Sequence, residues 1–444
     1  MTNRSTRRGF LKHAAACAAL PLIARCRTTA ASPNGKLQHA AIGVGGRGRL
    51  VTTAIGGREN VEVVAICDID ENSLNQAAQA YPEARRYRDW RELLAQEGDR
   101  VDSVSVATPD HAHAPAVMSA IRGGKHVYCE KPLTHTVYEA RQLAVAARKA
   151  GVATQMGIQI HAHAVYRQAV RLLRDGAIGK VKAWHSWSQA RYSSPGMTRP
   201  AGEDPVPAHL DWDLWIGVAP MRPYKEGVYH PGRWRGWQDF GCGAMGDFGC
   251  HIFDPVFTAL EIGAPLSVRG EAPEMNDEVW PHWGIVHYEF PGTKLTADST
   301  IEATWYDGGK KPPKELASMP DGQDLPDSGS LIIGQEGVMV LPHFKDAQLY
   351  PVERFRDYSQ PEVGHGNHFG EWVDACLGRG RALANFDYSG PLTEAVLLGN
   401  IAVRFPGKTL EWHTGKLRFR DAPEADAFLR RRYRPGWAVP GLTT

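Results

Sequence analysis

The chain has 444 residues, of which 43% are hydrophobic and 23% are charged, and its net charge at pH 7 is +2. This length exceeds one ordinary domain core, so the sequence predicts two globular domains. The near balance of charge gives no reason to expect nucleic acid or an anionic membrane surface as a partner.

The first part of the chain reads as a targeting signal. The twin arginines Arg7-Arg8 are followed by Gly-Phe-Leu-Lys, by a mild apolar run over residues 13–24 and by small residues. Such a pattern is typical of a secretory signal, and the run is too short to form a transmembrane segment. It resembles a Tat signal, which predicts a signal over residues 1–32, use of the Tat export machinery and a periplasmic location. A basic disordered segment and a lipid anchor at Cys26 are the alternatives.

Five of the seven cysteines follow the predicted signal. Cys67, Cys129 and Cys376 lie in apolar patterns and are expected to be small core residues. Cys242 and Cys250 could pair, but Tat substrates fold in the cytoplasm, which favours free thiols. The sequence has no Cys-x-x-Cys or His-Glu-x-x-His pattern, so no metal site is predicted.

A glycine-rich turn separates the first strand-like segment from the first helix. Gly43-x-Gly45-x-x-Gly48 closes the apolar run 37–44, and a second apolar run, 61–67, ends at Asp68. Strand, glycine turn, helix, strand and acid in this order are the context of a dinucleotide-binding fingerprint. We therefore expect a pyrophosphate to rest on the N-terminus of the helix.

The acidic residues after the second strand bear on the choice of cofactor. Asp68 follows Gly48 by 20 residues, where a carboxylate can bind ribose hydroxyls. Asp68 and Asp70 together disfavour a 2′-phosphate, which predicts NAD. Arg47 and Arg49 leave NADP as the less favoured choice.

Strands and helices continue to alternate up to residue 157. This pattern predicts a doubly wound parallel Rossmann sheet, assigned to residues 36–156, whose strand ends face the same crevice as the glycine turn. For His111 and His113, which follow the third apolar strand, the alternative to a cofactor contact is a role as loop residues that cap the next helix. The predicted cofactor contacts are Gly43, Gly45, Gly46, Arg47, Gly48, Asp68, Thr108, Pro109, His111, His113, Glu130, Lys131 and Gln155.

Beyond residue 157 the pattern changes. Closely spaced strand patterns at 180–189, 283–290, 294–302, 330–333 and 338–341 predict an α+β domain over residues 157–425 with an open, mostly antiparallel sheet. Residues 426–444 are expected to form a tail that docks on the body, beginning as a helix over part of 425–437.

Four motifs together resemble the glucose–fructose oxidoreductase, inositol dehydrogenase and MocA (Gfo/Idh/MocA) family. The resemblance covers nearly the whole chain after the signal, and Glu-Lys-Pro is its most specific part. It implies a homo-oligomer, a dimer or tetramer, formed through the outer face of the second sheet. The motifs are the glycine turn, Thr108-Pro109-x-His111, Cys129-Glu130-Lys131-Pro132-Leu133 and Asp247-x-Gly-x-His251.

Three residues are predicted to carry the chemistry. Lys131 ends a buried strand, where an ammonium needs a partner or must titrate; a surface lysine held by Glu130 is the alternative. Asp247 and His251 are spaced i, i+4, on one face of a helix that Asp254 extends; a metal pair or a simple helix salt bridge is the alternative. The resemblance implies that these three share the proton chemistry of alcohol oxidation. We expect His251 to be the base, Lys131 to polarise the hydroxyl and Asp247 to orient both.

A tryptophan-rich segment is predicted to shape a sugar pocket, since indole faces stack on sugar rings and arginine binds hydroxyls. Core packing is the alternative for these tryptophans. The predicted substrate contacts are Tyr229, His230, Trp234, Arg235 and Trp237.

These features predict oxidation of a secondary hydroxyl of a sugar or glycoside, with NAD tightly held because free NAD is scarce outside the cytoplasm. Redox-neutral glycoside hydrolysis is the first alternative. Tat-exported NAD-dependent α-N-acetylgalactosaminidases also resemble this chain in the signal and first domain, but lack a pair like Asp247 and His251. A non-catalytic sugar- or NAD-binding protein is the second alternative.

Overall fold

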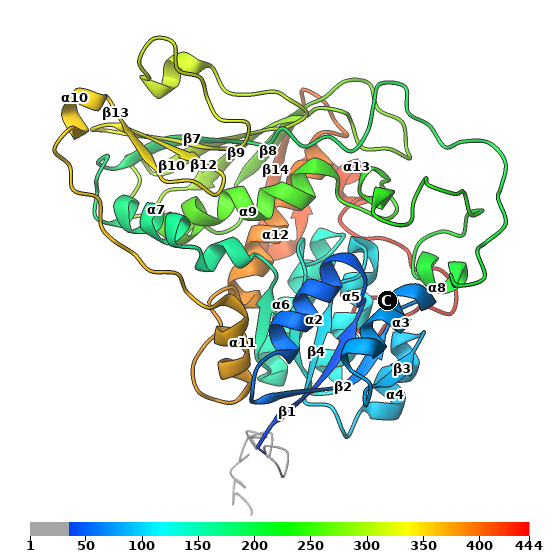
Figure 1. The fold of residues 1–444 in the computed structure, drawn as a ribbon. Helices are drawn as coiled ribbons and strands as arrows, with labels where there is room; N and C mark the ends of the chain where they lie inside the picture. The colour runs from blue at the N-terminus through cyan, green and yellow to red at the C-terminus, as the bar shows by residue number, and fades with distance from the viewer. Residues whose placement is uncertain (1–34, 444) are drawn as a thin grey trace, which may run out of the picture. The chain divides into compact units, whose positions relative to one another are not determined.

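The computed structural model describes residues 35–443 (Figure 1). The predicted Tat signal, with Cys26, therefore lies outside the described residues. Residues 35–443 belong to one compact unit, which contains two β-sheets and the helices that cover them.

The first sheet confirms the predicted doubly wound Rossmann fold. Its strand order is β3-β2-β1-β4-β5-β6, and every neighbouring pair is parallel. The order reverses between β1 and β4, where the crossover helices leave to opposite faces and a crevice opens at the carboxyl ends of the strands. The strands are β1 Leu37–Ile42, β2 Val61–Cys67, β3 Arg85–Tyr87, β4 Ser103–Val106, β5 His126–Cys129 and β6 Thr154–Met156.

Helices connect these strands, each beginning after a short loop that follows the strand end. Asp70 caps one of them by accepting a hydrogen bond from Asn72 N at 2.9 Å, and Thr136 and Glu139 form a capping box at another. Such caps satisfy the free N–H groups of a first helical turn, which fixes where each helix begins. The helices are α2 Gly46–Gly56, α3 Glu71–Ala80, α4 Trp90–Glu97, α5 His113–Arg122 and α6 Val137–Ala150.

The second sheet has nine strands in the order β13-β12-β11-β7-β10-β9-β8-β14-β15. It is mostly antiparallel, as predicted, but β7 and β10 pair in parallel. The strands are β7 Val181–Trp187, β8 Ser267–Glu271, β9 Ile285–Pro291, β10 Thr300–Tyr306, β11 Gly329–Gly334, β12 Val338–Pro342, β13 Gln348–Tyr350, β14 Thr409–His413 and β15 Arg418–Phe419.

One strand lies later in the chain than predicted. Residues 294–299 form a turn in place of the start of β10, because the Thr296 hydroxyl bonds Thr293 N at 2.8 Å and Asp298 O at 3.0 Å. A threonine hydroxyl that bonds nearby backbone competes with a strand ladder.

The helix α9, Gly243–Leu260, is almost entirely buried and packs against the second sheet, α7 (Ala164–Arg174) and α12 (Phe386–Ala402) (Figure 1). It carries Asp247 and His251 toward the Rossmann strand ends. The other helices are α8 Trp212–Ile216, α10 Val352–Phe355, α11 His368–Cys376 and α13 Pro423–Asp426.

The tail contains less helix than predicted. The predicted helix is confined to α13, which ends at Asp426, and the residues that follow form turns and irregular structure. The tail is instead held by contacts, with Val439 and Leu442 both 6% exposed.

The five cysteines of the described residues are free and buried, which confirms the predicted thiols. Within residues 35–443, every helix falls short of the length or hydropathy that crossing a bilayer requires.

Candidate active site

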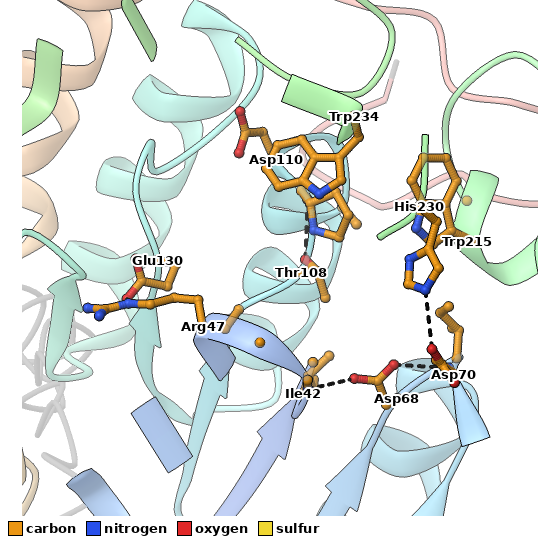
Figure 2. Close-up of a pocket in the computed structure, with 18 of the residues that line it drawn as sticks. Ile42, Arg47, Asp68, Asp70, Thr108, Asp110, Glu130, Trp215, His230 and Trp234 are labelled. Atoms are coloured by element: carbon orange, nitrogen blue, oxygen red, sulfur yellow. Dashed lines mark hydrogen bonds and ion pairs between the residues drawn. The ribbon is translucent and has the colours of Figure 1, made fainter. Parts of the chain in front are cut away.

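A cavity of about 560 Å³ lies along the carboxyl ends of the Rossmann strands (Figure 2). The glycine turn forms one wall, and residues from the second domain and the tail form the other. Of the residues predicted from sequence, those that line it are Gly43, Gly45, Gly46, Arg47, Asp68, Thr108, Pro109, Glu130, Lys131, His230, Trp234, Arg235 and His251.

The glycine turn has the shape that a pyrophosphate requires. A Cβ on Gly48 would lie 1.8 Å from Gly43 O, and one on Gly43 would lie 2.7 Å from Ala107 O, so the turn packs tightly against β4. Gly46, at φ +46°, faces open space. A turn that is closed toward the sheet and open toward the cavity lets a phosphate approach the N-terminus of α2. The site therefore fits a dinucleotide.

Asp68 supports this turn as well as lining the cavity. Its carboxylate accepts hydrogen bonds from Val44 N at 2.8 Å, Gly45 N at 3.1 Å and Asp70 N at 3.0 Å. These bonds fix the distance between the end of β2 and the glycine turn. Asp68 thus defines the ribose end of the cavity, where a Rossmann site places its acidic residue.

Arg47 and Asp68 lie on opposite sides of the glycine turn (Figure 2). Arg47 Nε donates to Glu130 Oε1 at 2.9 Å, so its positive charge is paired with Glu130 and not with Asp68. The carboxylates of Asp68 and Asp70 therefore dominate the ribose end. This distribution of charge suits NAD better than NADP, whose 2′-phosphate would meet negative charge.

Lys131 and Asp247 form an ion pair at the other end of the cavity. Lys131 Nζ donates to Asp247 O at 2.9 Å and also to Asp247 Oδ1, while the Tyr192 hydroxyl donates to Asp247 Oδ2. Arg235 Nε lies 3.5 Å from the same carboxylate. Burial alone would raise the pKa of Asp247, but the charges of Lys131 and Arg235 lower it well below its usual range. Asp247 is therefore ionised.

His251 lies one helical turn from Asp247, as its spacing predicts, but the two are not hydrogen-bonded to each other in the described structure. Lys131, Tyr192 and Arg235 occupy the carboxylate instead. His251 lines the cavity, and its Nδ1 is buried without a partner. Burial, with the charge of Lys131, lowers the pKa of His251 well below its usual range. The ring is thus neutral, the state that a base requires.

Asp110 belongs to the same end of the cavity, although its sequence position gave no indication of a role. It is 4% exposed, lines the cavity and accepts a hydrogen bond from Cys242 N at 3.0 Å. Burial raises the pKa of Asp110 to about 7, and Arg235 opposes that rise. In sequence it is the variable residue of Thr-Pro-x-His, and only its position beside a strand-ending proline could have drawn attention to it.

Four predicted cofactor contacts do not line the cavity, contrary to expectation: Gly48, which packs against Gly43, and the side chains of His111, His113 and Gln155. The ring nitrogens of His111 lie 3.3 Å from Phe240 O and 3.0 Å from Trp215 O, and those of His113 lie 2.8 Å from Pro132 O and Thr108 O. The amide of Gln155 donates to His368 O at 2.7 Å. These side chains hold the loops behind the cavity, since each is directed to backbone carbonyls.

The predicted sugar contacts divide into three groups. Tyr229 and Trp237 are each 1% exposed and belong to a buried aromatic cluster, so they pack as core, contrary to expectation. His230 lines the cavity, but at the ribose end, where Nε2 lies 3.2 Å from Asp70 Oδ2 (Figure 2). Trp234 and Arg235 remain near Lys131, with the guanidinium 4.4 Å from the indole centroid.

The second acidic residue of α9, Asp254, makes a structural contact. Its carboxylate lies 2.8 Å from His161 Nδ1 and accepts a bond from the Tyr388 hydroxyl at 2.6 Å. In the described part of the chain, no group of three or more His, Cys, Asp or Glu side chains is placed to hold a metal ion.

Comparison with known families gives two matches. Residues 37–158 match the NAD-binding Rossmann fold of the Gfo/Idh/MocA oxidoreductase family, and residues 185–308 match the C-terminal alpha/beta domain of that family. Together they cover more than half of the chain.

Curated relatives match shorter parts. D-apiose dehydrogenase of Paraburkholderia graminis is 35% identical over 27% of this chain and 32% of its own length. Inositol 2-dehydrogenase of Salmonella paratyphi B is 31% identical over 32% of this chain and 43% of its own length. A glycosyl hydrolase family 109 protein of Stenotrophomonas maltophilia is 27% identical over 52% of this chain and 48% of its own length. The chain thus matches between a third and a half of each of these relatives.

Solved structures share the fold over most of the chain. The WlbA dehydrogenase of Bordetella pertussis, in complex with NADH and UDP-GlcNAcA, has a TM-score of 0.59 at 16% identity, over 85% of this chain and 99% of its own. The aldose-aldose oxidoreductase of Caulobacter crescentus has a TM-score of 0.57 at 18% identity, over 85% and 100%.

The raised pKa of Asp110 makes a prediction about stability. The folded protein holds a proton on Asp110 that the unfolded chain loses between about pH 4 and 7, so this residue costs stability as pH rises through that range. Asp110→Asn keeps an acceptor for Cys242 N and removes the cost. Its melting temperature relative to wild type should therefore rise by about 2 to 4 °C between pH 5 and pH 8.

Calorimetry at the two pH values checks this, with Asp421→Asn as the control for an exposed carboxylate. The same difference from wild type at both pH values would contradict the assignment.

Proposed function

Since this chain belongs to the Gfo/Idh/MocA oxidoreductase family, we propose that it oxidises a secondary hydroxyl of a sugar or glycoside to a ketone, using bound NAD. The observation that carries the proposal is the position of the Lys131–Asp247 pair. It borders the same cavity as the glycine turn, beyond the strands β4 and β5. In a Rossmann site the nicotinamide lies toward that end, opposite the ribose acid.

The cofactor, when bound, accepts a hydride from the carbon that is oxidised. Lys131, positioned by its contacts with Asp247, donates a hydrogen bond to the substrate oxygen and stabilises the negative charge that develops there. His251 is neutral and lines the cavity, so we assign it the role of accepting the hydroxyl proton. Tyr192 and Arg235 hold Asp247 and prevent it from taking that proton itself.

The polar and aromatic walls support a polyhydroxylated substrate. Trp234 offers an indole surface beside the Arg235 guanidinium, and Asp110 offers a carboxyl group at the same end of the cavity. An aromatic face packs on sugar C–H groups, while charged groups bond hydroxyls. Similarity to relatives named for D-apiose and inositol agrees with this class of substrate.

A second function, redox-neutral glycoside hydrolysis, is favoured by the match to a glycosyl hydrolase family 109 protein, which extends over 52% of this chain. In that scheme the same residues would hold the substrate while bound NAD would take up a hydride from a ring carbon and later return it. Between these two steps the proton next to the ketone and the aglycone would be eliminated, and water would add in place of the aglycone. A non-catalytic binding protein would give the Lys131–Asp247–His251 group no use, so this role receives the least support.

The proposal also includes export and assembly. The sequence of residues 1–32 supports Tat export to the periplasm with NAD already bound and tightly held. Cofactor that does not exchange must be recycled in place, which both functions above allow. Family resemblance supports a dimer or tetramer.

Replacing Lys131 tests the catalytic assignment. Lys131→Ala should lower kcat for sugar oxidation about 100- to 1000-fold, because the developing oxyanion loses its donor. NAD binding should persist, since the glycine turn is unchanged. Lys182→Ala, on an exposed position of β7, is the control. Normal turnover of Lys131→Ala would exclude the proposed role.

The nucleotide itself can be identified. Protein purified without added cofactor and then denatured should release NAD or NADH in near-stoichiometric amount, as measured by mass spectrometry. Release of a 2′-phosphorylated nucleotide would contradict the charge argument at Asp68 and Asp70.

Aryl glycosides separate the two functions. The dehydrogenase should yield a keto-glycoside and reduced cofactor without release of the phenol. Phenol release with no added acceptor and no net change in the cofactor would instead establish the hydrolase.

A further inference from the structure

The ribose end of the cavity is enclosed by residues from outside the Rossmann domain. Leu214, Trp215 and Val218 line it from the second domain, and Trp437 lines it from the C-terminal tail. A Rossmann domain alone leaves the nucleotide at an open sheet edge. Here the adenosine half would be covered.

The second domain is fastened to the end of β2 by backbone pairing. Glu71 N donates to His209 O at 2.8 Å, and Asp211 N donates to Ile69 O at 3.1 Å, on either side of a β-bridge between Asp70 and Leu210. Backbone hydrogen bonds of this kind fix the covering segment directly beside Asp68.

The tail reaches the same region along a different path. In Figure 1 it runs, in red, from α13 to the side of the first sheet where α3 and α8 lie. Arg434 anchors it, since its N donates to Val218 O at 3.1 Å, its Nε to Gly217 O at 3.0 Å and its guanidinium to Asp213 Oδ1 at 2.5 Å. The Tyr433 hydroxyl donates to Glu139 Oε1 at 2.7 Å.

These anchors hold Trp437 against the cavity. Its N donates to Arg434 O at 3.1 Å, and the Arg91 guanidinium lies 3.9 Å from its ring centroid. The side chain is 7% exposed, yet the ring borders a cavity large enough for a nucleotide. Arg91 belongs to α4, and Arg88, which bonds Ile69 O just beyond β2, lines the same cavity, so Trp437 lies on the ribose side of the site.

We propose that Trp437 contacts the adenine ring of bound NAD and that the docked tail, residues 427–443, keeps the cofactor from exchanging. The identity of the cofactor rests on the proposed function. The flat indole suits a purine, because every base offers a face to an aromatic side chain. Release of the nucleotide then requires the tail to leave its anchors on Val218, Gly217 and Asp213.

The rate of cofactor exchange tests this directly. Protein loaded with NAD is mixed with an excess of isotopically labelled NAD, and the bound label is followed by mass spectrometry. Trp437→Ala should exchange about 10- to 100-fold faster than wild type, as expected for the loss of one base–aromatic contact. Trp437→Phe should stay near the wild-type rate. Exchange of Trp437→Ala at the wild-type rate would overturn the proposal.

Two further variants guard the interpretation. Trp437→Leu keeps apolar packing without a flat ring, so it should fold and exchange faster; it decides the outcome if Trp437→Ala does not fold. Phe428→Ala removes an exposed aromatic of the tail that does not line the cavity, and it should exchange at the wild-type rate. An equal increase in Phe428→Ala would overturn the assignment to Trp437.

The same experiment separates this proposal from the proposed function. Wild-type protein that neither retains nor binds NAD would exclude the function and the tail contact together. Wild-type protein that binds NAD, with Trp437→Ala and Trp437→Leu unchanged in exchange rate, would exclude the tail contact alone.

Discussion

The ion pair between Lys131 and Asp247 is the interaction on which the described structure most depends. It joins the end of β5 to α9, and its side chains are only 15% and 13% exposed. A buried charge without a partner is costly, so each residue fixes the other in place. Tyr192 and Arg235 also contact the Asp247 carboxylate, so the positions of the two charges are fixed before a substrate displaces water.

Burial, more than this pair, sets the protonation of its neighbours. Burial lowers the pKa of His251, with a smaller contribution from Lys131, and burial raises the pKa of Asp110, which Asp247 reinforces and Arg235 opposes. The site therefore holds a lysine donor, an ionised aspartate, a neutral imidazole and a carboxyl group that titrates near neutrality. Different environments for similar groups are what separates acid from base roles in one site.

Much of this could be predicted from the sequence, because the features involved are local. The glycines of the turn can be recognised in the sequence because a Cβ at these positions would clash with neighbouring backbone. The spacing of Asp247 and His251 places both residues on one helix face. The strand pattern likewise predicted the two sheets. Each inference uses a period or a motif that depends on neighbours only a few residues away.

The rest depends on contacts between distant segments. Tyr192 reaches Asp247 from an irregular loop, and Trp437 reaches the cavity from the tail, so no spacing marks either. Residue type also misled, since Tyr229 and Trp237 have the chemistry of sugar contacts but point into the core. The helix face of Asp247 could be predicted from its spacing to His251. The spacing could not show that Lys131 and Tyr192, rather than His251, hydrogen-bond the Asp247 carboxylate.

The central claim is that the Lys131–Asp247 end of the cavity delivers hydrogen from a sugar carbon to the nucleotide at the glycine turn. In the most direct measurement, the protein is incubated with a sugar or glycoside deuterated at its ring carbons and then denatured, and the mass of the released nucleotide is determined by mass spectrometry. The account predicts a nucleotide heavier by one deuterium, formed by the wild-type protein and not by Lys131→Ala. A nucleotide that stays unlabelled while substrate is converted would contradict it.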